Sequence, residues 1–130
     1  MPRPDGLRCR DRVTGETRWH DGRGRVLGSP AVDGAIVYAA FVREEIAAID
    51  VHSGTEQWSV DETGCWTSPA IGSDVVFVTA GDSLLAIEKS NGRRRWRFDD
   101  PGLGGDSYSD PIVVGDAVVA GSIGRPLTIL

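Results

Sequence analysis

The chain has 130 residues, which is the size of one modest domain. Hydrophobic residues make up 40% of it, charged residues 25%, and the 17 glycines indicate a turn-rich globular protein rather than a disordered or fibrous one. The net charge of -5 argues against a nucleic-acid-binding protein, because affinity for phosphates comes mainly from clustered lysines and arginines.

The chain shows no membrane or targeting segment. No apolar run approaches the roughly 18 residues that a membrane-spanning helix needs, and the opening MPRPDGLRCRD lacks the apolar segment of a signal peptide. Cys9 and Cys65 lie far apart and fit no metal-ligand spacing, so each is interpreted as a small buried hydrophobe. We expect a soluble chain with no membrane span, and its compartment stays unknown.

The first predicted element is a hairpin over residues 7–20. Asp11 ends its first strand, and its carboxylate and the Thr14 hydroxyl can accept hydrogen bonds from turn amides. Gly15 is expected to take a backbone conformation that is closed to other residues. Trp19 follows on the second strand, where its indole is expected to lie flat on the glycine of this turn and to cover the neighbouring sheet.

Two longer units follow, over residues 28–60 and 67–98. Each opens on Ser-Pro, at Pro30 and Pro69, where proline fixes φ at the start of a strand. A β-branched and aromatic run then predicts a second strand, over residues 36–40 and 75–79. A third and a fourth strand complete each unit. A last segment, residues 109–130, starts the same way at Pro111 but lacks the fourth strand.

The hairpin signature occurs three times with the same spacing from acid to tryptophan. Its residues are Asp11, Gly15, Trp19, Asp50, Gly54, Trp58, Glu88, Gly92 and Trp96. Four-stranded units of about 40 residues that pack side by side are propeller blades. The sequence therefore predicts an all-β fold, a partial β-propeller of about three four-stranded antiparallel blades. The alternative is a β-sandwich with accidental self-similarity.

The pattern Ala-x-Asp-x-x-Thr-Gly-x-x-x-Trp, best matched by Ala48, Asp50, Ser53, Gly54 and Trp58, resembles the tryptophan-docking repeat of the PQQ-like β-propeller family. That family includes quinoprotein alcohol dehydrogenases and the outer-membrane assembly factor BamB. The resemblance covers nearly the whole chain and implies the fold more specifically than the function. Its members are often exported.

The resemblance also implies how the chain is divided, because in that family the tryptophan lies on the outermost strand of its blade. Residues 7–20 would be the outer hairpin of a preceding blade, 28–60 and 67–98 full blades, and 109–130 an incomplete blade. The family closes with about eight blades. An open arc exposes apolar faces and sheet edges, so the chain is either part of a longer propeller, which we favour, or a homo-oligomer.

The expected function is that of a non-catalytic scaffold that binds a protein partner, like BamB. The alternative is a fragment of a quinoprotein dehydrogenase, for which the resemblance would imply PQQ stacked on a tryptophan and a bound calcium ion. A sensor domain fused to a kinase or a membrane anchor is a third possibility.

No residue is assigned to catalysis, to a cofactor or to a metal. Trp66 and Tyr108 are interpreted as channel-lining aromatics rather than as quinone contacts. An acidic solvated loop is preferred to a calcium site at Asp99, Asp100, Asp106 and Asp110. His20 and His52 have no nucleophile to activate. The basic run at residues 93–95 is interpreted as a solvated turn.

Overall fold

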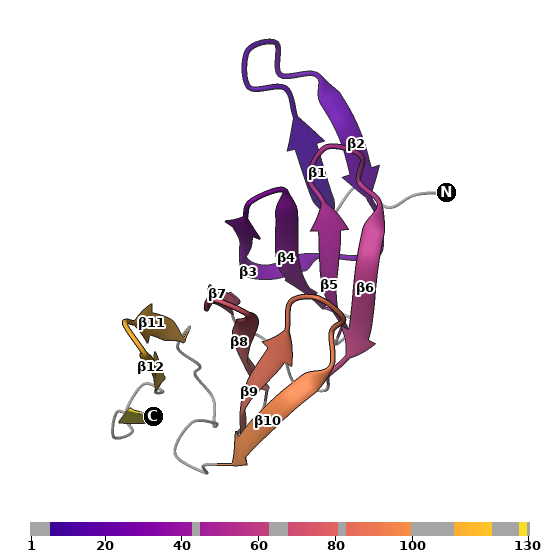
Figure 1. The fold of residues 1–130 in the computed structure, drawn as a ribbon. Coiled ribbons are helices and arrows are strands. Elements are labelled where there is room, and N and C mark those ends of the chain that lie inside the picture. The colour runs from indigo at the N-terminus through magenta and orange to yellow at the C-terminus, as the bar shows by residue number, and fades with distance from the viewer. Residues whose placement is uncertain are drawn as a thin grey trace.

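The computed structural model describes residues 6–42, 45–62, 68–80, 83–99, 111–120 and 128–129. All regular elements of this described part are β-strands, which form antiparallel sheets that follow one another along the chain (Figure 1). The all-β class expected from the sequence is confirmed. The described residues contain no helix that is long and apolar enough to cross a membrane.

Each sheet is built from consecutive strands. The first sheet contains β1 (Leu7–Arg10) and β2 (Thr17–Asp21). The second contains, in spatial order, β3 (Val26–Asp33), β4 (Ile36–Phe41), β5 (Glu45–Asp50) and β6 (Glu56–Asp61). The third contains β7 (Ala70–Ile71), β8 (Val75–Ala80), β9 (Ser83–Glu88) and β10 (Arg94–Asp99). The fourth contains β11 (Ile112–Val114), β12 (Ala117–Ala120) and β13 (Thr128–Ile129).

The three prolines of the repeated motif lie at positions where a strand does not need a backbone N–H for its ladder of hydrogen bonds. Pro69 and Pro111 stand just before β7 and β11, as expected. Pro30 instead lies inside the edge strand β3, where the pairing with β4 is irregular between Leu27 and Ala31. A register break on an edge strand is a position at which proline costs no ladder hydrogen bond. The strand therefore begins earlier than the Ser-Pro motif predicts.

The central strands are buried on both faces, which explains their continuous apolar sequences. Alternate residues of β4 enter different clusters because side chains point to opposite faces of a strand. Val37 and Phe41 pack toward the first sheet, in a cluster with Leu7 and Trp19. Tyr38 packs on the other face, in a cluster with residues of β8 and β9.

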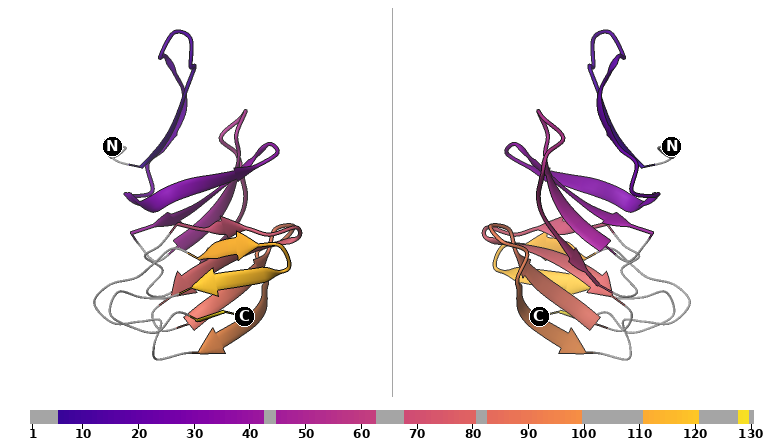
Figure 2. Two further views of the ribbon diagram at one scale, coloured as in Figure 1. Left: turned by 90° about the vertical axis from the view of Figure 1, so that its left-hand side faces the viewer. Right: turned by 90° about the vertical axis from the view of Figure 1, so that its right-hand side faces the viewer.

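The main core lies between the second and third sheets. Its buried members are Tyr38, Ala40, Ile46, Ala48, Trp58, Val76, Val78, Leu85 and Ile87. A smaller cluster joins the third sheet to the fourth through Leu84 and Val118, with Phe77 packed against it. Hairpin β1–β2 projects beyond the other sheets (Figure 2). The molecule is thus a row of sheets, each of which buries apolar side chains against the next.

Candidate functional site

The turns between the third and fourth strands of each unit have nearly the same structure. In the first turn, Asp11 Oδ1 accepts hydrogen bonds of 2.9 Å from the amides of Val13 and Thr14. In the second, Asp50 Oδ1 accepts bonds of 2.8 and 3.0 Å from the amides of His52 and Ser53. These bonds hold the pKa of Asp11 and Asp50 below the ordinary value for an aspartate, for Asp11 with help from the guanidinium of Arg18.

The third turn has the same backbone hydrogen bond as the first two turns but different side-chain hydrogen bonds. Its glycine amide, at Gly92, donates 2.9 Å to the carbonyl of Glu88, as Gly15 does to Asp11 and Gly54 to Asp50. Glu88 accepts a 3.0 Å bond from Asn91 Nδ2, and Asn91 Oδ1 accepts one from the amide of Arg93. The three glycines have φ of 78°, 74° and 77°, the left-handed region that glycine adopts without strain.

Trp19, which is half-buried, and Trp58, which is buried, each dock on the glycine turn of the next sheet along the chain, and not on the glycine of their own hairpin as the sequence predicted. Trp19 Nε1 donates 2.8 Å to the carbonyl of Val51, and a Cβ built on Gly54 would lie 2.8 Å from Trp19 Cγ. Trp58 Nε1 donates 2.6 Å to the carbonyl of Lys89, and a Cβ on Gly92 would lie 2.7 Å from Trp58 Cε3. Only glycine leaves room for these rings.

Of the three tryptophans and three glycines of the signature, Trp96 and Gly15 have no docking partner among the described residues. Trp96 is 36% exposed, whereas Trp58 is 8% exposed. Its ring packs on Phe77, with ring centroids 5.8 Å apart. No described atom lies within 4 Å of a Cβ built on Gly15. The structure therefore shows two tryptophan-on-glycine contacts, Trp19 on Gly54 and Trp58 on Gly92, which we call docks. Among the described residues, Trp96 and Gly15 take part in no such contact.

An open cleft of about 360 Å³ lies beside Trp96, between the third and fourth sheets. Apolar side chains line much of it, including Phe77, Val113 and Val118, and Asp74, Arg95 and Asp116 add charges. Arg95 Nη1 is 2.8 Å from Asp74 Oδ2, which lowers the pKa of that carboxyl. The cleft thus combines an aromatic wall with a charged rim.

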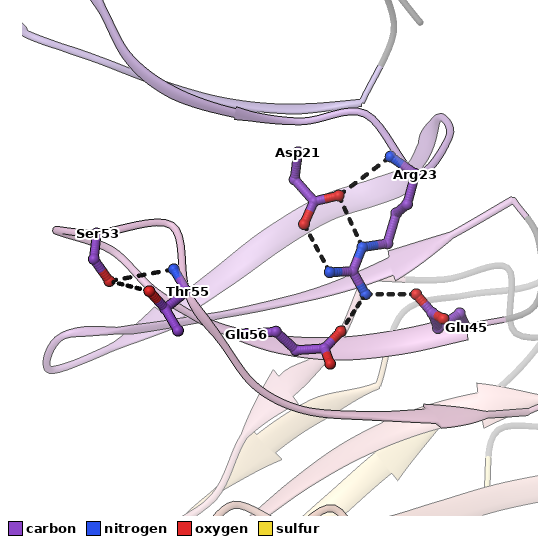
Figure 3. Close-up of polar contacts among 6 residues, drawn as sticks. All are labelled: Asp21, Arg23, Glu45, Ser53, Thr55 and Glu56. Atoms are coloured by element: carbon purple, nitrogen blue, oxygen red, sulfur yellow. Dashed lines mark hydrogen bonds and ion pairs between the residues drawn. The ribbon is translucent and has the colours of Figure 1, made fainter. Parts of the chain in front are cut away.

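A cluster around Arg23 ties the first sheet to the second (Figure 3). The guanidinium binds Asp21 through two bonds of 2.8 and 2.7 Å, and its Nη1 also lies 2.6 Å from Glu45 and 2.7 Å from Glu56. It stands 5.2 Å from the centre of the Phe41 ring. The bonds from Arg23 lower the pKa of Asp21. Sequence reasoning missed this cluster, because Arg23 lies outside the repeated motif.

The inner strands are linked by a contact that the sequence did not reveal. The amide of Ser29 donates 2.6 Å to Ser68 Oγ, and a Cβ on Gly28 would lie 2.5 Å from the same oxygen. The repeated Ser-Pro pair therefore supplies a hydrogen bond between neighbouring sheets as well as a proline.

The other residues considered from the sequence do not converge on a site. Trp66, Tyr108, Cys65, Asp100, Asp106 and Asp110 lie outside the described residues. Asp99 accepts bonds from Ser83 and Arg97, which lower its pKa. Cys9 is half-buried and free, with Sγ 3.7 Å from the carbonyl of Val51. The part of the chain that the structure describes holds no group of three or more His, Cys, Asp or Glu arranged for a metal ion.

Sheets of consecutive antiparallel strands, clamped in a row by indole rings, define a partial β-propeller. A profile described as outer membrane protein assembly factor BamB matches residues 6–130. The chain therefore belongs to this BamB-like family of PQQ β-propeller repeats, as the sequence predicted.

Curated relatives support the same family. The chain is 33% identical over 98 residues to the outer membrane protein assembly factor BamB of Xanthomonas campestris pv. campestris, with 74% of this chain and 23% of the relative covered. It is 36% identical over 91 residues to the BamB of Alkalilimnicola ehrlichii, covering 69% and 23%. The chain thus spans about a quarter of the length of these relatives.

Solved structures confirm the partial propeller. The crystal structure of BamB from Moraxella catarrhalis superposes with a TM-score of 0.79 at 17% identity, over 99% of this chain and 44% of that one. Quinohemoprotein alcohol dehydrogenase from Comamonas testosteroni gives a TM-score of 0.64 at 24% identity, over 78% and 18%. At these identities the likeness shows the fold alone.

Proposed function

We propose that this chain is part of a non-catalytic PQQ-like β-propeller that acts as a protein-binding scaffold. The observation that carries the proposal is the match to two curated BamB proteins at 33% and 36% identity, both named outer membrane protein assembly factors. We extend that role, assembly of outer membrane proteins, to this chain. The dehydrogenase alternative has only a likeness of fold in its support.

We also propose that the blades divide as the repeat predicts, with residues 28–60 and 67–98 as full blades. The order of strands within the second and third sheets, which is sequential in each, supports that division. Residues 7–20 then form an outer hairpin, and residues 109–130 an incomplete blade.

A scaffold needs a rigid surface, and one end of the two four-stranded sheets offers it. There the turns of each sheet are joined by backbone bonds, from Val51 to Ala35 at 2.7 Å and from Lys89 to Asp74 at 3.1 Å. Lys89 Nζ reaches Asp33 of the neighbouring sheet. We name this surface, residues 33–36, 50–55, 72–75 and 88–93, the turn face. Its fixed, polar turns suit a protein partner.

Site-specific crosslinking tests the scaffold role. A photoreactive amino acid is placed at His52 or Ser90, both exposed on the turn face, with exposed Ser59 on the edge of β6 as the matched control. We expect one protein species to be crosslinked in cells from the turn-face positions and not from Ser59. Equal labelling from all three positions, or no adduct, would contradict the proposal.

An activity assay tests the non-catalytic part separately. The purified chain is mixed with PQQ and calcium, and reduction of an artificial electron acceptor by alcohols is measured. We expect no rate above that of the protein-free mixture. Alcohol-dependent reduction that needs all three components would overturn the proposal and favour a quinoprotein.

A further inference from the structure

The third glycine turn differs from the first two in one chemical respect. Asn91 stands at the position that Thr14 and Ser53 hold in the other turns. We propose that Asn91 is a site of spontaneous modification, in which water converts its carboxamide to aspartate and isoaspartate through a cyclic succinimide, and that this change loosens the dock of Trp58 on Gly92. The inference goes beyond the scaffold role and does not depend on it.

The side chains at this position have the same structural role in all three turns. The amide two residues further on donates 3.2 Å to Thr14 Oγ1, 3.2 Å to Ser53 Oγ and 2.8 Å to Asn91 Oδ1. A hydroxyl is sufficient for this bond, so the turn does not require an asparagine. Only the asparagine places an electrophilic carbon, its Cγ, next to the backbone nitrogen of a glycine, which has no side chain to hinder an attack.

The reaction balances with water as the co-reactant. The backbone nitrogen of Gly92 loses its proton to base and forms a bond to Asn91 Cγ, and the bond from Cγ to Nδ2 breaks, which releases ammonia. Water then opens the succinimide ring. Cleavage of the new bond to Cγ gives aspartate, and cleavage of the original peptide bond gives isoaspartate, with the backbone rerouted through the side chain. No oxidant or reductant is needed.

The described contacts both favour and restrain this reaction. The amide of Arg93, 2.8 Å from Asn91 Oδ1, donates to the oxygen that becomes negative when the nitrogen attacks, as an oxyanion donor does. The N–H of Gly92 instead donates 2.9 Å to the carbonyl of Glu88, and the nitrogen cannot attack while this bond holds. The reaction therefore proceeds when the turn opens.

The dock of Trp58 keeps the turn closed. Asn91 itself is exposed, so water and base reach its carboxamide, whereas Gly92 is buried. Trp58 Nε1 donates 2.6 Å to the carbonyl of Lys89, and its ring covers Gly92. Because the indole contacts the turn at both places, the turn must move away from the indole before it can open. The dock thus restrains the modification.

Both products weaken the dock in return. Asn91 Nδ2 donates 3.0 Å to Glu88 Oε2, and a carboxylate in its place cannot donate and repels Glu88. Isoaspartate also inserts one additional carbon into the backbone before Gly92. A Cβ built on Gly92 would already lie 2.7 Å from Trp58 Cε3, so the dock leaves no room for a displaced turn. Modification is therefore expected to be one-way, because the product no longer closes fully.

Ageing of the purified chain in mildly alkaline buffer, followed by peptide mapping with mass spectrometry, tests the reaction. The chain contains one asparagine and one glutamine, Asn91 and Gln57, so a loss of ammonia can be assigned to its residue. Asn91→Ser reproduces the residue of the second turn, and Asn91→Gln keeps the amide but needs a larger ring. Both variants are matched controls, and circular dichroism checks that they keep the β-structure.

We expect the wild-type chain to gain the mass of NH₂ replaced by OH at residue 91, and to become a substrate for labelling by isoaspartyl methyltransferase. Gln57 and both control variants should stay unchanged. A wild-type chain that keeps its amide at residue 91 would overturn the proposal. An equal gain in Asn91→Gln would overturn it as well, because the attack by the Gly92 nitrogen would then not be the route.

Exchange of the indole N–H protons, followed by NMR, tests the effect on the dock. Trp58 and Trp19 both donate to a turn carbonyl, at 2.6 and 2.8 Å, but the turn that receives Trp19 contains no asparagine. Trp19 is therefore an internal control. In the aged chain we expect the Trp58 proton to exchange about fivefold faster or more, and the Trp19 proton at its original rate. An unchanged Trp58 rate, or an equal increase for both protons, would overturn the proposal.

Discussion

Trp58 docks on Gly92 across the boundary between the second and third sheets, at the edge of the core that joins them. The indole lies where a Cβ of residue 92 would come within 2.7 Å of it, and its N–H reaches the Lys89 carbonyl at 2.6 Å. One residue supplies the bulk and the donor, and the other supplies the empty space. The contact between these two sheets therefore requires both the Trp58 indole and a glycine at position 92.

Gly92→Ala should destabilise the chain more than an alanine at an equally left-handed but open glycine. Both Gly92→Ala and Gly34→Ala introduce positive φ strain, which costs about 1–2 kcal/mol. Only Gly92→Ala also forces a methyl group into the Trp58 ring, which adds about 1–3 kcal/mol of overpacking. Urea unfolding gives both free energies. Equal losses of unfolding free energy in the two variants would show that the Trp58 ring moves aside without a measurable energetic penalty.

Trp58→Ala should cost about 3–5 kcal/mol of the free energy of unfolding, because it removes a buried aromatic side chain and leaves the Lys89 carbonyl unpaired. The matched control is Trp96→Ala, at the same position of the next repeat. Trp96 is 36% exposed, so its loss should cost about 1 kcal/mol or less. Similar losses of unfolding free energy for both variants would contradict the conclusion that Trp58, and not Trp96, is docked on a glycine turn.

Arg23→Gln should loosen hairpin β1–β2 specifically. The change leaves Asp21, Glu45 and Glu56 close together without their cation, and we expect a loss of about 1–2 kcal/mol, between the values for exposed and buried ion pairs. Hydrogen exchange should quicken in β1 and β2 more than in β8 and β9. Arg18→Gln is the control, since Arg18 pairs with Asp11 at the exposed tip and should change little.

Acid should weaken the chain through Asp50. Hydrogen bonds from the amides of Ser53 and His52 place the pKa of folded Asp50 below the ordinary value of 3.8. The unfolded chain therefore binds the proton first, so this stabilisation is present above pH 3.8 and is lost as the pH falls through the lower folded pKa.

The Asp50→Asn variant tests this pH dependence, because it keeps an acceptor oxygen and removes the charge. It should be less stable than the wild type at pH 7, with a difference that shrinks as the pH falls below 3.8. Chemical unfolding at several pH values measures it. A difference that stays constant down to the acid transition would mean that the carboxylate charge contributes nothing.

The sequence alone determined the β-strands, the glycine turns and the repeated tryptophan, because each depends on neighbours within a few residues. An acid, a hydroxyl or amide side chain, and a glycine at fixed spacing form the turn around Asp50 from local hydrogen bonds alone. Continuous apolar runs such as β4 already indicated strands buried on both faces. These features could be predicted without coordinates.

Only the tertiary structure decided which partners meet across the sheets. Trp58 contacts Gly92 of the following repeat. Arg23 binds the carboxylates of Glu45 and Glu56, which lie 22 and 33 positions away in the sequence. Among the described residues, the same fold leaves Gly15 and Trp96 without a docking partner, although both belong to the repeated signature. Contacts between sheets depend on how strands stack in space, and no local spacing in the sequence encodes that stacking.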